Sequence, residues 1–126
     1  MKLLLDTHIL LWALATPEKL GAKLREALED PRNTVLVSSA SVWEIEIKKT
    51  LGKLVAPSNL GEVVDAARFT ELAIGIRHAE RIAELPDFHR DPFDRMLVAQ
   101  ALVEDAVLVS RDRLVQAYPC RHWSSS

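Results

Sequence analysis

Three short apolar runs constrain this chain more than any other feature, because polar residues and then an amphipathic segment follow each of them. The runs are Leu3–Leu5, Val35–Val37 and Val107–Val109. Apolar runs of this length, with no polar alternation, are typical of strands buried within a parallel sheet. The segment "TELAIGI", Thr70–Ile76, has the composition of a fourth strand.

Helices are expected between these strands, with ends marked by capping residues and prolines. A Ser, Thr or Asp follows each of the three apolar runs and can cap the next helix. The expected helical segments are Pro17–Asp30, one after Ser41, one capped by Ser58, Arg77–Leu85 and Arg90–Leu102. Strands that alternate with helices predict an α/β fold with a mostly parallel central sheet.

Length and apolar content predict a single domain that covers residues 1–126. Of the 126 residues, 48% are hydrophobic, which suits one compact core, and no repeat or linker divides the chain. Ser124–Ser126 are expected to be frayed. The formal net charge of −2 argues against a general electrostatic nucleic-acid binder, so any phosphate contact must come from a local patch.

The cysteine content and the N-terminal residues indicate the cellular compartment in which the protein is expected. Cys120 is the only cysteine, so neither an intrachain disulfide nor a C-x-x-C site can form. This indicates a reducing compartment, and we expect the cytoplasm. The opening "MKLLLDTHILLWALA" faintly resembles a signal peptide, but Asp6 and His8 interrupt its apolar run. No apolar run reaches membrane-spanning length, so no membrane association is expected.

The polar corners after the strands are the expected places for a functional site. In open α/β sheets, ligands bind outside the carboxyl ends of the strands. These corners hold Asp6-Thr7-His8, Ser38-Ser39 and Ser110-Arg111-Asp112. Thr7, Ser39 and Ser110 can orient water or phosphate by hydrogen bonds, or can simply cap the following helices.

Two carboxylates lean toward faces that ought to be apolar. At about 100° per residue, Asp94 lies within about 80° of an i+3, i+4, i+7 stripe. That stripe consists of Leu97, Val98, Ala101 and Leu102. Glu44 borders the apolar face expected for its own helix, made of Trp43, Ile47, Leu51 and Leu54. An unpaired buried charge costs several kcal/mol or shifts its pKa, so both carboxylates need compensation.

Helix capping is the simpler explanation for each acid taken alone. Asp6 and Asp112 each stand where a helix N-cap is expected, and Asp is a favoured residue there. "SVWE", Ser41 to Glu44, matches a capping box, and Asp94 stands three residues after Asp91 in a similar pattern. A carboxylate needed only as a cap, however, can point to water.

Either basic side chains or a bound metal ion could compensate the buried charges of Asp94 and Glu44. Lys48 and Arg95 are expected to lean away from these faces or to flank them. A hard divalent cation, Mg²⁺ or Mn²⁺, takes oxygen ligands and suits the four carboxylates Asp6, Glu44, Asp94 and Asp112. No cysteine cluster or pair of histidines at metal spacing points to zinc. Such a metal would screen a phosphodiester and lower the pKa of a bound water.

Four blocks, "LLLDTHILLWAL", "VSSASVWEIEIK", "HRDPFDRMLVAQAL" and "LVSRD", span nearly the whole chain. Together they resemble the PIN-domain family and, more narrowly, the VapC-type toxins of bacterial toxin–antitoxin pairs. The resemblance implies a small three-layer α/β/α nuclease with a clustered acidic site and Mg²⁺ or Mn²⁺. It also implies cleavage of RNA, a homodimer, and a cognate VapB-like antitoxin that covers the site.

The resemblance carries the family's four acidic positions onto this chain, as metal ligands and catalytic residues. They are Asp6, Glu44, Asp94 and Asp112, of which the fourth varies across the family. Asp91 is an additional carboxylate, expected to be an N-cap because Pro92 follows it. His8 is expected to be structural, while His89 either contacts a nucleic-acid backbone or is solvated.

Other classes of protein share parts of this pattern. A haloacid dehalogenase-type phosphatase needs a second Asp two residues after the first, where His8 stands. A receiver-like signalling domain needs an acidic pair after its first strand, and "DT" does not supply one. A PIN-fold binding module without catalytic activity is the alternative that remains beside the endoribonuclease, because function follows the site rather than the fold.

Overall fold

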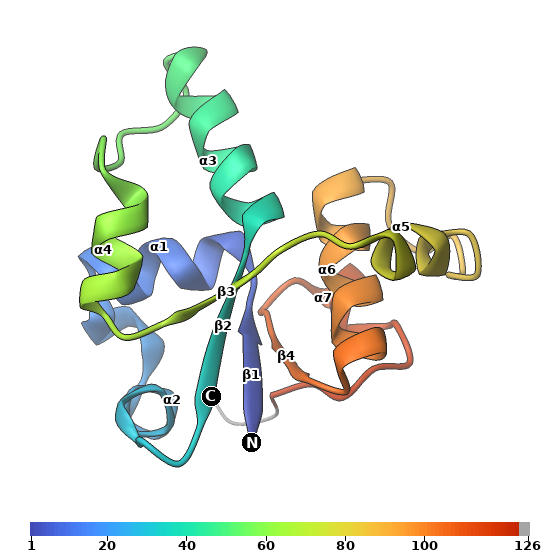
Figure 1. Cartoon of the computed structure of the whole chain (residues 1–126), viewed down its shortest axis with the longest axis horizontal. Helices are drawn as coiled ribbons and strands as arrows, with labels where there is room; N and C mark the ends of the chain where they lie inside the picture. The colour runs from blue at the N-terminus through green and yellow to red at the C-terminus, as the bar shows by residue number, and fades with distance from the viewer. Residues whose placement is uncertain (124–126) are drawn as a thin grey trace.

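The computed structural model describes residues 1–123, which contain a four-stranded, wholly parallel sheet in the order β3-β2-β1-β4 (Figure 1). The strands are β1 Lys2–Leu5, β2 Thr34–Ser38, β3 Thr70–Leu72 and β4 Val107–Val109. In the register, Leu4 of β1 pairs with Leu36 of β2 and with Leu108 of β4. All four expected strands are therefore confirmed, although β3 is shorter than predicted. The expectation for Ser124–Ser126 lies outside the described residues.

Helices fill the connections between the strands. They are α1 Thr7–Ala15, the 3₁₀ helix η1 Pro17–Leu20, α2 Ala22–Glu29, α3 Ser39–Thr50, α4 Leu60–Ala66, α5 Ile76–Ile82, α6 Pro92–Glu104 and α7 Arg113–Gln116. The segment predicted as one helix over Pro17–Asp30 is broken at Gly21, whose φ of 84° lies in the region that favours glycine. Asn59, not Ser58, is the N-cap residue of α4.

Two cores lie on opposite faces of the sheet. Side chains alternate along each strand, so Leu3 and Leu5 face one core while Leu4 faces the other. The first core also contains residues of α1, α2, α3 and α4, and the second contains residues of α6 and α7. Figure 1 shows α1, α2 and α4 on one side of the sheet and α5, α6 and α7 on the other. The three-layer α/β/α architecture is confirmed.

The strand order creates a crevice between β1 and β4. From β1 the chain passes through α1 and α2 to β2, on one side of the sheet. From β3 it passes through α5 and α6 to β4, on the other side. Neighbouring strands whose connections leave toward opposite faces form the usual ligand-binding crevice of such sheets. The backbone N–H of Asp6 donates to the carbonyl of Val109 at 3.0 Å, which ties the two strand ends together.

Helix α3 is oriented differently from the sequence prediction. The predicted apolar face is largely exposed, with Trp43 at 60%, Ile47 at 37% and Leu51 at 61% relative exposure. The helix instead buries the face that carries Glu44 and Ile45. Ile45 on this face belongs to the first core and Val42 packs against it, while Glu44 contacts another part of the chain, described below.

No helix within residues 1–123 combines the length and the apolar character needed to cross a membrane.

Candidate functional site

The four acids predicted from the sequence line one groove at the carboxyl end of the sheet. The groove has a volume of about 800 Å³, and Asp6, Glu44, Asp94 and Asp112 all line it. Asp91 lines it as well. These side chains come from four separate parts of the chain, namely the ends of β1 and β4 and the helices α3 and α6.

Asp6 is placed by the start of α1. It is the N-cap residue, and its Oδ1 accepts a hydrogen bond from the backbone N–H of Ile9 at 2.8 Å. Only 6% of the residue is exposed. Burial raises the pKa of Asp6, although a hydrogen bond from Ser110, the Ile9 N–H and the nearby His8 partly oppose this rise. A buried carboxylate that still faces a groove is a ready ligand for a cation.

Glu44 is held from two sides. The hydroxyl of Thr7 donates to its Oε1 at 2.7 Å, and the ammonium of Lys48 donates to its Oε2 at 2.7 Å. The hydrogen bond to Glu44 is the main reason that the pKa of Lys48 is raised. Lys48 was expected to lean away from this face or to flank it, and so to leave Glu44 without a basic partner; the ion pair shows that Glu44 has one. The contact with Thr7 links α1 to α3 and explains why α3 turns the Glu44 face inward.

The capping box that was the alternative explanation for Ser41 and Glu44 does not form. Ser38 is the N-cap residue of α3 and accepts from the N–H of Ala40 at 3.0 Å, while Ser41 is buried within the helix. Glu44 therefore does not cap α3, and its side chain instead contacts Thr7 of α1.

Asp91 and Asp94 share the first turn of α6. Asp91 is the N-cap, as predicted, and its Oδ1 accepts from the backbone N–H groups of Phe93 at 2.8 Å and Asp94 at 3.2 Å. Burial raises the pKa of Asp94 to about 7, and the negative charges of Asp91, Glu44 and Asp6 act in the same direction. His89 opposes this rise. Asp94 therefore lies in a strongly negative environment.

Asp112 closes the groove beside β4. It is the N-cap residue of α7, and its Oδ1 accepts from the N–H of Leu114 at 2.8 Å. Its side chain is 40% exposed. Burial acts to raise the pKa of Asp112, but the backbone hydrogen bond of Leu114 and the contact with His89 outweigh it, and the pKa is lowered. Asp6, Asp91 and Asp112 thus cap helices and line the groove at the same time.

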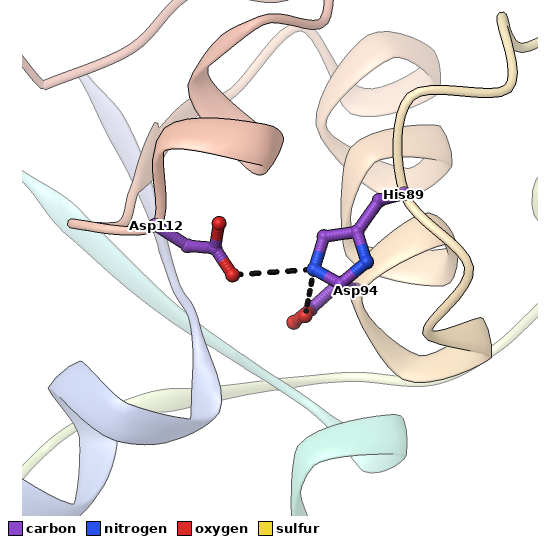
Figure 2. A group of neighbouring side chains, drawn as sticks. All are labelled: His89, Asp94 and Asp112. Atoms are coloured by element: carbon purple, nitrogen blue, oxygen red, sulfur yellow. Dashed lines mark hydrogen bonds and ion pairs between the residues drawn. The ribbon is translucent and has the colours of Figure 1, made fainter.

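His89 is the residue of the site that the sequence interpretation missed. Figure 2 shows its ring between Asp94 and Asp112, with Nε2 at 3.0 Å from Asp94 Oδ2 and 3.2 Å from Asp112 Oδ2. Its Nδ1 accepts the backbone N–H of Asp91 at 3.1 Å. The side chain is only 14% exposed, so it is neither solvated nor free to reach a distant backbone. Because His89 stands two residues before the N-cap of α6, the sequence could have placed it near Asp94. Its contact with Asp112 could not be predicted, because Asp112 lies far along the chain.

The donor set fits a hard divalent cation. One ligand atom each from His89, Asp94 and Asp112 lies within 4.8 Å of the other two. The carboxylates of Asp6 and Glu44 line the same groove. Oxygen-rich sites suit Mg²⁺ and Mn²⁺. Burial is the main cause of the raised pKa of Asp94 and the neighbouring carboxylates add to it, so a divalent cation would offset both effects.

Comparison with known proteins defines the family. The family model of the PIN domain matches residues 3–119, so this chain belongs to the PIN domain family. No curated protein is similar enough in sequence to match.

Several solved structures share this fold at low sequence identity. A chain of VapBC2 from Rickettsia felis, bound to a DNA fragment from the promoter, is 18% identical, with 98% of each chain covered and a TM-score of 0.73. A chain of DNA-bound VapBC from Salmonella typhimurium is 19% identical, with 98% of this chain and 97% of that chain covered and a TM-score of 0.70. A chain of FitAcB from Neisseria gonorrhoeae is 19% identical, with 97% and 96% covered and a TM-score of 0.61. The likeness extends over essentially the full length of each chain.

Proposed function

We propose that this protein is a Mg²⁺- or Mn²⁺-dependent endoribonuclease and the toxin of a toxin–antitoxin pair. The observation that carries the proposal is the convergence of Asp6, Glu44, Asp94 and Asp112 on one groove at the switch point of a PIN-domain sheet. The likeness of the fold to chains of VapBC from Rickettsia felis and Salmonella typhimurium supports the VapC-type role and a VapB-like antitoxin as partner.

The residues of the groove have distinct roles in this proposal. Asp6, Glu44, Asp94 and Asp112 would hold the cation, which when bound would activate a water and screen the phosphodiester. Thr7 fixes one oxygen of Glu44 by its hydrogen bond of 2.7 Å. His89 contacts Asp94 and Asp112, so it orients both carboxylates. Groups that hold ligands in this way are expected to influence metal affinity strongly.

Metal-dependent cleavage of RNA tests the proposal. Purified protein is incubated with total RNA and Mg²⁺ or Mn²⁺, and cleavage should stop with EDTA or with Asp6→Asn. Asp65→Asn, which changes an exposed carboxylate of α4 outside the groove, is the matched control and should cleave normally. Intact RNA under every divalent ion tried would favour the alternative, a PIN-fold binding module without catalytic activity.

We also propose that the protein is a homodimer, as the family resemblance implies. Trp43, Ile47 and Leu51 form an exposed apolar stripe along α3, and the ring of Trp43 stacks edge-to-face on Phe93 of α6 at 5.3 Å. A second copy of the chain would bury this stripe. In sedimentation velocity, Ile47→Glu should shift the protein from dimer to monomer. A monomeric wild-type protein at tens of micromolar would contradict the proposal.

A further inference from the structure

The connector that precedes α6 carries His89 but has no regular secondary structure of its own. It covers Pro86–Arg90, between α5 and α6, and most of its residues are exposed. Within residues 1–123, no backbone–backbone hydrogen bond joins this connector to another part of the chain. The His89 side chain is nevertheless only 14% exposed and lies between two carboxylates (Figure 2). Side chains must therefore fix the conformation of the connector, because its backbone makes too few contacts to do so.

The guanidinium of Arg95 holds the connector from α6. Its Nη1 donates to the carbonyl of Pro86 at 3.0 Å and to the carbonyl of His89 at 3.4 Å. Its Nη2 donates to the carbonyl of Ile82, the last residue of α5, at 3.3 Å. The Arg95 side chain is 18% exposed, so its charge is largely removed from water and depends on these acceptors. The planar fork of a guanidinium can bond several carbonyls at once, which a lysine ammonium cannot reproduce.

Tyr118 holds the same connector from the segment after α7. Only 2% of this residue is exposed, and its ring packs on Phe88 with centroids 5.1 Å apart. Its hydroxyl oxygen accepts the backbone N–H of His89 at 2.9 Å and the Nη1 donor of Arg95 at 3.1 Å. The backbone N–H of His89 is therefore bonded to Tyr118 and its carbonyl to Arg95, so both backbone polar groups of this residue are fixed.

The fixed backbone also determines how the His89 ring meets the carboxylates. Its Nδ1 accepts the backbone N–H of Asp91, so the proton of the neutral ring is on Nε2. Nε2 faces Asp94 Oδ2 and Asp112 Oδ2 and donates to them. Asp94 and Asp112 line the groove, whereas His89 is not among the lining residues. The ring is thus placed to orient two carboxylates.

We propose that Arg95 and Tyr118 are positioning residues of the metal site that act through His89. They hold the backbone of His89, and its ring in turn holds Asp94 and Asp112 close together at the groove. The inference rests on the proposed function, because it assumes that the groove binds Mg²⁺ or Mn²⁺. It extends the site to two side chains that do not line the groove. Outer groups that orient metal ligands commonly affect metal affinity.

Titration of the metal-free protein with Mn²⁺ alone tests the inference without RNA, with free Mn²⁺ measured by its EPR signal. Tyr118→Phe removes one oxygen and keeps the buried ring. It should weaken Mn²⁺ binding about tenfold, at the low end of the range for groups that orient metal ligands. Arg95→Lys keeps the charge but loses the planar fork, and it should also weaken binding.

Val64→Ala is the control for a general loss of stability. Val64 is buried in the core on the other face of the sheet, so its truncation leaves a cavity far from the connector. This variant should bind Mn²⁺ as tightly as wild type.

A double-variant cycle shows whether Tyr118 acts through His89. His89→Ala alone should weaken Mn²⁺ binding by about 10- to 100-fold. Tyr118→Phe added to His89→Ala should cause no further loss, because the ring that Tyr118 positions is already absent. A role of Tyr118 in general stability would instead persist without the His89 ring.

The outcomes separate this inference from the proposed function. If folded Tyr118→Phe and Arg95→Lys proteins bind Mn²⁺ as tightly as wild type, the inference is overturned and the metal site stands. The same holds if Tyr118→Phe weakens binding by an equal factor with and without His89. If wild type binds no Mn²⁺, the proposed metal-dependent function and this inference are overturned together.

Discussion

At the scale of single residues, the negative charge on Asp94 is unfavourable in the folded, metal-free protein. Its pKa is raised to about 7, first by burial and then by the charges of Asp91, Glu44 and Asp6. A group whose charged form is this unfavourable in the folded state destabilises the protein above that pKa. Asp94 therefore lowers the stability of the folded protein, which indicates that its role is functional rather than structural.

Replacement of Asp94 by Asn should separate activity from stability. Activity should fall by more than about 100-fold, since even the outer partners of a metal ligand are worth 10- to 100-fold. The free energy of unfolding of the metal-free protein should rise by about 2 kcal/mol, because the variant removes a buried charge and its repulsion by the neighbouring carboxylates. Cleavage assays and urea unfolding at pH 8 in EDTA measure the two effects. A clear loss of stability would show that Asp94 is mainly structural.

The stability change should depend on pH with a defined sign. In the unfolded chain the Asp94 carboxyl has its ordinary pKa of 3.8, whereas burial and the neighbouring charges raise that pKa to about 7 in the folded protein. Below both values the residue is neutral in both states and contributes nothing, so its destabilising effect grows as pH rises from about 4 to about 7. The difference in melting temperature between Asp94→Asn and wild type, in EDTA, should therefore be small at pH 4.5 and reach its maximum by pH 8. A difference that does not vary with pH would refute the raised pKa.

At the scale of elements, the start of α6 places two carboxylates in the groove with one turn of helix. Asp91 caps the helix through the N–H groups of Phe93 and Asp94, and Pro92 stands at the first helical position. The same turn aims Asp94 at His89. Capping and site formation thus depend on a single local geometry, because the hydrogen bonds that start the helix also fix the direction of its first side chains.

Two variants of Asp91 distinguish its cap from its charge. Asp91→Ser keeps a capping oxygen and removes the charge, whereas Asp91→Ala removes both. The alanine variant should be less stable than the serine variant by about 1 kcal/mol, the usual worth of an N-cap. Denaturant unfolding at one pH measures this difference. Equal stability of the two variants would mean that the cap contributes nothing.

Strands and most helices were predictable because their signals are local. The apolar runs around Leu4, Leu36 and Leu108, and the Asp91-Pro92 start of α6, each lie within a few consecutive residues. The orientation of α3 was not predictable in this way, since it depends on the contact of Glu44 with Thr7, 37 residues away. The Lys48–Glu44 pair was missed although its i,i+4 spacing is a local signal.

At the scale of the whole molecule, the strand order brings the acids together. Asp6 and Asp112 follow β1 and β4, which are adjacent in the sheet and far apart in the chain. The sequence indicated a carboxyl-end site for any parallel sheet, but not which strands are neighbours. The hypothesis that four acids share one metal site came from their places at strand ends and helix starts, and the family resemblance carried the same four positions onto the chain.

A cation bound by all these elements should stabilise the whole fold. At a hundredfold excess over its Kd, Mn²⁺ should raise the free energy of unfolding by about 2.7 kcal/mol. The melting temperature of wild type and of Asp65→Asn should rise on addition of Mn²⁺. The double variant Asp6→Asn/Asp94→Asn should show no such rise, and an equal rise would place the cation elsewhere.

The pairing of β1 with β4 also sets when the groove can exist. Asp6 is made early in synthesis, but Asp112 and Arg111 reach it only after β4 has joined β1 at the edge of the sheet. A nascent chain on the ribosome, surrounded by RNA, therefore lacks one wall of the acidic groove until its last strand has emerged. The fold delays the complete groove until translation of the domain is nearly finished.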